Sequence, residues 1–170
     1  MKTSIEKPYE VQLDLETSLG SPIENQQHTQ MVPNLDTENL RQSFNRRFPN
    51  RLVERTKNGT NFYNCHGLVF ASRRTRIFSS DTVRKILKDD AYARVADNDV
   101  KPGDIVLYVH KGAIDHSAVV VDVQTSDLPN IRSIKVFSKW GKWCEVIHGV
   151  LDCDWAQEPE TLIEYYRVER

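Results

Sequence analysis

The second half of the chain alternates short apolar runs with turn signals, and this pattern limits the fold more than any other feature of the sequence. Lys101-Pro-Gly-Asp104 is a turn, and a continuous apolar run follows at 105–109. Further runs rich in β-branched and aromatic residues follow at 116–123, 131–137, 144–151 and 162–168. Runs of this length, separated by short polar loops, predict consecutive β-strands that pair antiparallel.

The first half of the chain predicts helices instead of strands. The spacing of apolar residues indicates helices over 36–48, from Cys65 to Ser72 and from 80 or 81 to 96. Asn64 can serve as the N-cap of the second of these helices. Helices followed by an antiparallel meander predict an α+β fold.

Residues 1–35 differ from the rest of the chain in composition. They contain three prolines and a polar run at 24–30, and alternating apolar residues occur only at 11–15. A segment with so little apolar surface is not expected to pack well. We therefore predict a poorly ordered N-terminal segment over 1–35 and a single domain over 36–170.

The charge of the chain is balanced. The 23 Lys and Arg residues against 24 Asp and Glu residues give a net charge of −1, which does not favour binding to nucleic acid or to an anionic membrane. One local basic cluster is interpreted as a solvated surface, with an acidic substrate tail or nucleic acid as alternatives. The cluster comprises Arg73, Arg74, Arg76, Arg84, Lys85 and Lys88.

The sequence also bears on where the protein works. No apolar window approaches the roughly 20 residues that a membrane helix needs. The first ten residues lack the apolar core of a secretory signal. These features predict a cytoplasmic location without membrane association, and they leave export by another route open.

Three cysteines are too few for a disulfide scaffold. In a reducing compartment, each is free for thiol chemistry. Cys144, His148 and Cys153 have the chemistry of a soft metal site but lack a fourth ligand at a recognisable spacing, so we expect no metal and no other cofactor.

Cys65 and His116 are the residues best placed for catalysis. A thiol reacts as thiolate, and a position in the first turn of a helix lowers its pKa. His116 is predicted to lie where a hairpin loop enters a strand, which is both rigid and accessible. An imidazole there can take the thiol proton and return it to a leaving group.

Three sequence blocks are similar to those of NlpC/P60 and related CHAP-type, papain-like cysteine peptidases. Asn-Cys-His-Gly-Leu-Val at 64–69 resembles their cysteine block, and Lys-Pro-Gly-Asp-Ile-Val-Leu-Tyr at 101–108 resembles the strand that follows it. Asp-His-Ser-Ala-Val-Val-Val at 115–121 resembles their histidine strand. The resemblance spans about residues 60–140 and keeps the family's order. It implies a helix carrying the nucleophile, Cys65, packed on an antiparallel sheet carrying the base, His116.

The sequence departs from this family at two positions. His66 stands where a small serine is usual, and it could narrow the mouth of the site. The family's third residue orients the histidine from the next strand. If a loop over 124–130 pairs Val123 with Ile131, Ser138 lies opposite His116, so Ser138 ranks ahead of His148 for this role; a site without a third residue is the other alternative.

The remaining predictions concern the oxyanion hole and the reaction. Asn61 and Tyr63, with Asn58, are the candidate donors upstream of the cysteine.

The expected activity is a cysteine hydrolase that cleaves an amide bond, peptide or isopeptide, through an acyl-enzyme. The alternatives are an acyltransferase or deamidase on the same scaffold, or a degenerate module that only binds. Trp140 and Trp143 suit either core packing or a substrate-binding lip. The sequence does not predict an oligomeric state.

Overall fold

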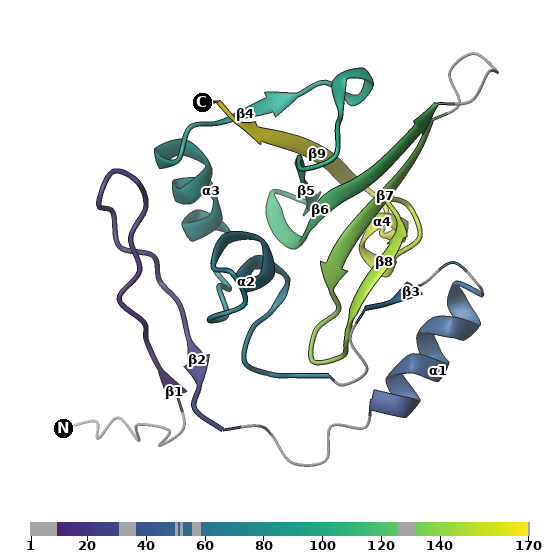
Figure 1. The fold of residues 1–170 in the computed structure, drawn as a ribbon, viewed down its shortest axis with the longest axis horizontal. Coiled ribbons are helices and arrows are strands. Elements are labelled where there is room, and N and C mark those ends of the chain that lie inside the picture. The colour runs from purple at the N-terminus through teal and green to yellow at the C-terminus, as the bar shows by residue number, and fades with distance from the viewer. Residues whose placement is uncertain are drawn as a thin grey trace.

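The computed structural model describes residues 10–30, 37–49, 51, 53–55, 59–125 and 132–169. Within these ranges the chain has the predicted α+β architecture, with a mostly antiparallel sheet and few helices (Figure 1). The order of strands in the larger sheet is β3-β8-β7-β6-β5-β9-β4, and each neighbouring pair is antiparallel. None of the described helices is long and apolar enough to cross a membrane.

The bounds of the elements are as follows. The helices are α1 (Thr37–Arg47), α2 (Cys65–Phe70), α3 (Ser80–Asp89) and α4 (Asp154–Gln157), with one 3₁₀ turn at Asp97–Asp99. The strands are β1 (Glu10–Val11), β2 (Gln27–His28), β3 (Val53–Glu54), β4 (Tyr92–Val95), β5 (Ile105–His110), β6 (Ala113–Thr125), β7 (Arg132–Lys139), β8 (Glu145–Gly149) and β9 (Thr161–Val168).

The large sheet is covered on both faces, which explains the continuous apolar run in β5. Val106 and Tyr108 belong to one core, together with the tryptophans near the β7–β8 turn. Leu107 and Val109 point to the opposite face, into a second core that includes residues of α3 and the end of α2. Because successive side chains of a strand alternate between faces, a strand buried on both sides carries apolar residues at every position.

The predicted register between β6 and β7 is wrong by two positions at the end that matters for the site. Ser138 pairs with Ala118 and not with His116, and Val123 pairs with Ile134. The register differs for two reasons. β6 continues to Thr125, into the segment expected to be a loop, and a β-bulge within β6 adds one unpaired residue. The error at Ser138 is an even number of residues, so this side chain still points to the face that carries His116.

A tight turn that pairs Ser138 with Cys144 would place His148 opposite Ile134, and the observed register between β7 and β8 differs from this expectation by two positions. Val136 pairs with His148, and Ser138 pairs with Val146. Ser138 and His148 are therefore diagonal neighbours on one face of the sheet, close enough for their side chains to meet.

Two further elements differ from the predictions. The third helix ends at Asp89, because Ala91 adopts a left-handed backbone conformation with φ of 56°. The chain then forms β4, the edge strand that pairs with β9. The short helix α4 was not predicted.

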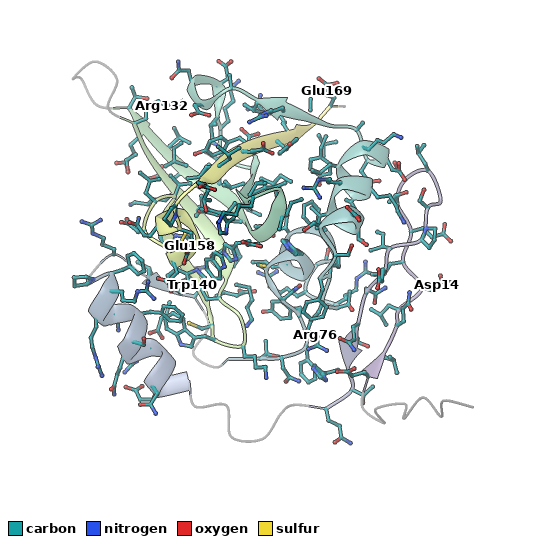
Figure 2. All side chains as sticks on the ribbon, turned by 180° about the vertical axis from the view of Figure 1, so that it is seen from behind. Asp14, Arg76, Arg132, Trp140, Glu158 and Glu169 are labelled. Atoms are coloured by element: carbon teal, nitrogen blue, oxygen red, sulfur yellow. The ribbon has the colours of Figure 1, made fainter. Side chains whose placement is uncertain are left out.

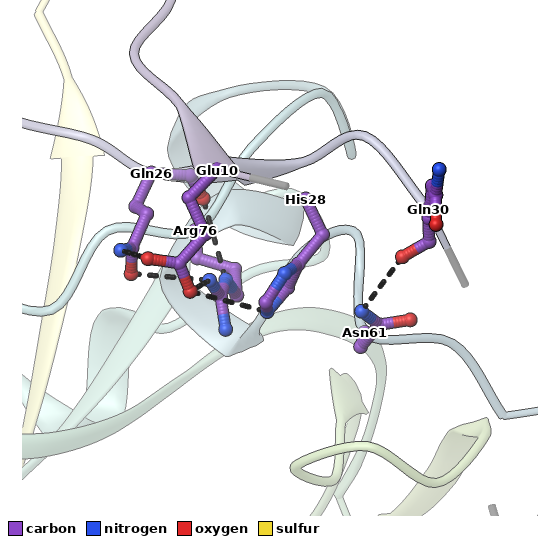
Figure 3. Close-up of polar contacts among 6 residues, drawn as sticks. All are labelled: Glu10, Gln26, His28, Gln30, Asn61 and Arg76. Carbon is purple, nitrogen blue, oxygen red and sulfur yellow. Dashed lines mark hydrogen bonds and ion pairs between the residues drawn. The ribbon is translucent and has the colours of Figure 1, made fainter. Parts of the chain in front are cut away.

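Residues 10–30 pack against the rest of the chain, which their composition did not indicate. Gln26 and Arg76 exchange two backbone hydrogen bonds, of 2.9 and 3.0 Å, and the side chain of Ile23 is buried. Glu10 forms ion pairs with Arg76 at 3.3 Å and with His28 at 3.8 Å (Figure 3). Polar side chains thus dock this segment beside α2 and α3 (Figure 1). The rest of the predicted N-terminal segment, 1–9 and 31–35, lies outside the described residues.

Candidate active site

Cys65 is the first residue of α2, as the sequence predicted. The side chain of Asn64 caps this helix by accepting a hydrogen bond from the backbone N–H of Gly67 at 2.9 Å. The same carboxamide bonds both backbone groups of Ile77, which fixes the start of the helix against the loop that follows it. The cysteine side chain is 8% exposed.

The environment of Cys65 favours the thiolate. Burial alone raises the pKa of the thiol, but the imidazoles of His66 and His116 act against burial. The net result is a thiol pKa well below its ordinary value. The two imidazoles come from α2 itself and from β6, so the fold brings together the predicted pair and one additional histidine.

His116 is held by packing rather than by hydrogen bonds. Its side chain is 0% exposed, and neither ring nitrogen has a hydrogen-bond partner among the described residues. The ring stacks on the indole of Trp155 in α4, with centroids 3.6 Å apart and planes 2° from parallel. Tyr108 lies on β5 with its ring centroid 5.4 Å away. His116 lowers the pKa of the Cys65 thiol, although the contact between them does not have ordinary hydrogen-bond geometry.

Trp155 is therefore expected to position the imidazole. Trp155→Ala should slow acylation of Cys65 by about tenfold to a hundredfold, because an unrestrained ring spends less time in the reactive geometry. Trp155→Phe keeps an aromatic face and should stay near the wild-type rate. The measurement is single-turnover acylation by an activated ester on variants whose thermal unfolding is recorded in parallel. Equal rates in all three proteins would contradict the role.

Ser138 bonds to groups other than His116. Its Oγ accepts a hydrogen bond from the indole N–H of Trp140 at 2.8 Å and lies 2.8 Å from Nε2 of His148. The Nδ1 of His148 lies 2.8 Å from the carbonyl of Gly149, so Nδ1 donates there and Nε2 accepts from the serine. Burial lowers the pKa of His148 to about 4, so this histidine is neutral. The structure thus joins the two candidates for third residue to each other.

Ser138→Ala should reduce stability without slowing the chemistry. The change removes the hydroxyl that bonds the buried nitrogens of Trp140 and His148 and leaves them only their longer contact of 3.3 Å with each other, at a cost of about 1–3 kcal/mol. Urea denaturation measures the free energy of unfolding, and acylation of Cys65 measures the chemistry. A tenfold slower acylation in a folded variant would instead assign Ser138 the orienting role that the sequence suggested.

The two described oxyanion candidates both donate to other groups. The hydroxyl of Tyr63 donates to the carboxylate of Glu145 at 2.7 Å, and the amide of Asn61 donates to the carbonyl of Gln30 at 3.3 Å (Figure 3). Asn58 lies outside the described residues. The first N–H groups of a helix have no intrahelical acceptor, so the backbone N–H groups at the start of α2 are the candidate oxyanion donors.

Lys139 is a buried cation near the thiol that the sequence analysis missed. Its Nζ donates to the carbonyls of Trp143 at 2.5 Å, Gly141 at 2.6 Å and Thr60 at 3.1 Å. Burial lowers the pKa of Lys139 to about 8, while nearby acidic groups, Cys65 among them, act to raise it. Three carbonyl acceptors match the three N–H groups of an ammonium, so the lysine is charged at neutral pH. It ties the segment before α2 to the β7–β8 turn.

The other two cysteines remain thiols. Burial raises the pKa of Cys144 to about 12 and that of Cys153 to about 11. In the part of the chain that the structure describes, no group of three or more His, Cys, Asp or Glu side chains is arranged to hold a metal ion. Trp140 (Figure 2) and Trp143 are both buried, and their rings pack against Phe44 of α1, so they belong to the core.

The basic cluster is largely committed to contacts within the chain. Arg73 pairs with Glu145 at 2.5 Å, and Arg76 pairs with Glu10. Lys85 donates to the carbonyl of Pro22 at 3.1 Å. The cluster was interpreted from the sequence as a solvated surface, whereas these contacts give several of its members a structural role.

Comparison of the chain with protein-family models, with curated proteins and with solved structures gave no match.

Proposed function

We propose that the protein is a cysteine hydrolase that cleaves an amide bond through Cys65 and His116. The observation that carries this proposal is a buried thiol with a lowered pKa, in the first turn of a capped helix, beside a buried histidine whose two nitrogens have no other partner. Buried polar atoms are normally hydrogen-bonded, and a buried group without a partner can have a catalytic role. On this proposal, the partner of the His116 nitrogens is the substrate.

The reaction follows from the arrangement of the groups. The Cys65 thiolate attacks the carbonyl carbon, and the protonated His116 gives its proton to the leaving amine as the C–N bond breaks. Neutral His116 then takes a proton from water, which attacks the thioester. The C–S bond breaks, the thiolate returns, and the acid is released. The charge that develops on the carbonyl oxygen is met by N–H groups at the start of α2.

The order of elements supports a papain-like site of the NlpC/P60 type. The helix that begins with Cys65 comes first. Strand β5 follows directly after the Lys101-Pro-Gly-Asp104 turn, and β6, the next strand, carries His116. This is the order of the three sequence blocks. On this proposal the substrate is a peptide or another amide-containing compound.

A thiol-directed trap tests the proposal. Incubation with a peptidyl acyloxymethyl ketone, followed by mass spectrometry of tryptic peptides, should show one adduct on Cys65 and none on Cys144 or Cys153. Cys65→Ala should show no adduct. An adduct on either of the other cysteines, or none at all under conditions where iodoacetamide labels Cys65, would overturn the assignment.

One observation favours a second candidate, a module that binds without catalysis. His116 has no exposed surface, and Cys65 has little. A substrate reaches such a pair only if the surrounding side chains move. Turnover of peptide amides by the wild-type protein separates the two candidates. Products formed with an added amine in place of water would indicate acyl transfer instead of hydrolysis.

A further inference from the structure

The ring of His66 points into the protein and not toward the mouth of the site, which the sequence suggested it could narrow. The side chain is buried. Its Nε2 lies 3.3 Å from the backbone carbonyl of Ile114, and its Nδ1 lies 2.9 Å from the hydroxyl of Ser117. Both partners are on β6, so the ring bridges the start of α2 to the strand that carries His116.

These two partners suit a doubly protonated ring. A carbonyl oxygen only accepts, so Nε2 of His66 must carry a hydrogen. The hydroxyl of Ser117 can accept as well as donate, so Nδ1 can carry one too. The surroundings of His66 thus satisfy both N–H groups of an imidazolium. His116 is different, because neither of its nitrogens has a partner in the described structure.

We propose that His66 is a positioning residue that holds a fixed positive charge beside the Cys65 sulfur, while His116 alone moves protons. This inference rests on the proposed hydrolase function. A charge fixed by Ile114 and Ser117 stays in place through both half-reactions, so the thiolate is stabilised both as nucleophile and as leaving group. The thiolate then does not depend on the protonation of His116.

The charges around His66 and the Cys65 thiol are consistent with a fixed positive charge on His66 and with proton transfer by His116. Burial lowers the pKa of His66, but the Cys65 thiolate and Asp115 raise it, and the net direction is upward. The thiolate interacts electrostatically with the imidazoles of His66 and His116 and, more weakly, with the ammonium of Lys139, whose N–H groups donate to three backbone carbonyls. Of the single interactions that oppose burial, the Coulombic attraction between the thiolate and His66 is the largest, and that with His116 follows it.

The pH dependence of Cys65 alkylation tests the proposal. Iodoacetamide labelling from pH 4 to 9, resolved by peptide mapping, is compared for wild type, His66→Gln and His116→Gln, with His28→Gln as a control away from the site. We expect His66→Gln to shift the alkylation profile to higher pH by at least about one unit, so that the rate falls about tenfold at pH values below both thiol pKa values. His116→Gln should keep most of the alkylation and lose turnover. An unchanged profile in His66→Gln, or a loss in His116→Gln as large as in His66→Gln, would overturn the proposal.

A second measurement does not depend on the folding of the His66 variant. Side-chain nitrogen NMR of His66 should show both nitrogens protonated near pH 7 in the wild type. In Cys65→Ser the titration of His66 should move to lower pH, because the interaction between thiolate and imidazolium is mutual. Identical titrations in the two proteins would contradict the ion pair. If the ion pair is present and no amide is cleaved, the proposed function fails and the role of His66 stands.

Discussion

His116→Gln should lower the rate at which an amide substrate acylates Cys65 by about a thousandfold, within the range that general acid–base groups contribute. Without the imidazole, the leaving amine lacks the proton donor that the proposed reaction uses. His66 cannot replace it, because its two nitrogens face Ile114 and Ser117. Single-turnover acylation with a peptide anilide measures the change. An activated ester, whose leaving group needs no proton, should be affected much less.

The matched control for this experiment is His148→Gln. His148 is also buried on the same face of the sheet, but it is neutral and bonded to Ser138. Its replacement should change stability and leave acylation within about threefold of the wild type, because the group holds no proton that the reaction uses. If instead His148→Gln abolished acylation and His116→Gln did not, the base would be misassigned.

The helix that begins with the cysteine and the strand that carries the histidine were predictable because both depend on local signals, although His116 lies buried within β6 and not accessible at its start. Asn64 marks a helix start, and a turn followed by apolar runs marks β5 and β6. The pairing of strands was not predictable to the residue, since a bulge leaves no clear mark in the sequence. A shift of two residues is enough to move Ser138 from His116 to Ala118.

Three contributors to the site were missed because their roles depend on contacts between distant segments. Trp155 belongs to a four-residue helix without a periodic pattern, yet it stacks on His116. Lys139 looks like a surface lysine at a strand end, yet it bonds three carbonyls. His66 was noticed only as a bulky departure from a family pattern. The direction of a side chain into the core becomes visible only when the packing is known.

The docking of the N-terminal segment was also not predictable, because it depends on polar contacts with a distant part of the chain. Composition measures how much apolar surface a segment can bury, and residues 10–30 have little. Their docking depends on Asn25, which hydrogen-bonds the hydroxyl of Thr75 at 2.9 Å, and on Gln26, which pairs with Arg76. The carboxamide of Asn25 also bonds the backbone of Leu13 in both directions. Hydrogen bonds of this kind require a partner segment that the local sequence does not reveal.

Gly67→Ala should destabilise the protein by about 3 kcal/mol or more, at the upper end of what overpacking costs. In an isolated helix the same change would stabilise by about 1 kcal/mol, so the expected sign is opposite to that of helix propensity. The reason is a close approach between backbones. A methyl group on Gly67 would overlap the carbonyl of Thr75, which is itself fixed by the docked N-terminal segment, and would lie 3.2 Å from the Cβ of Tyr63. Urea denaturation followed by circular dichroism measures the loss.

The control is Gly149→Ala in β8, where the new methyl group would meet only the rotatable carboxylate of Asp152. That variant should lose no more than about 1 kcal/mol, the typical effect of a point substitution. Because α2 carries Cys65 two residues before Gly67, any folded fraction of Gly67→Ala should also show slower alkylation of the thiol, as the helix start moves away from β6. Wild-type stability in Gly67→Ala would mean that α2 and the Thr75 segment do not touch as described. The first turn of α2 would then not be held against His116, and the lowered thiol pKa would lose its structural cause.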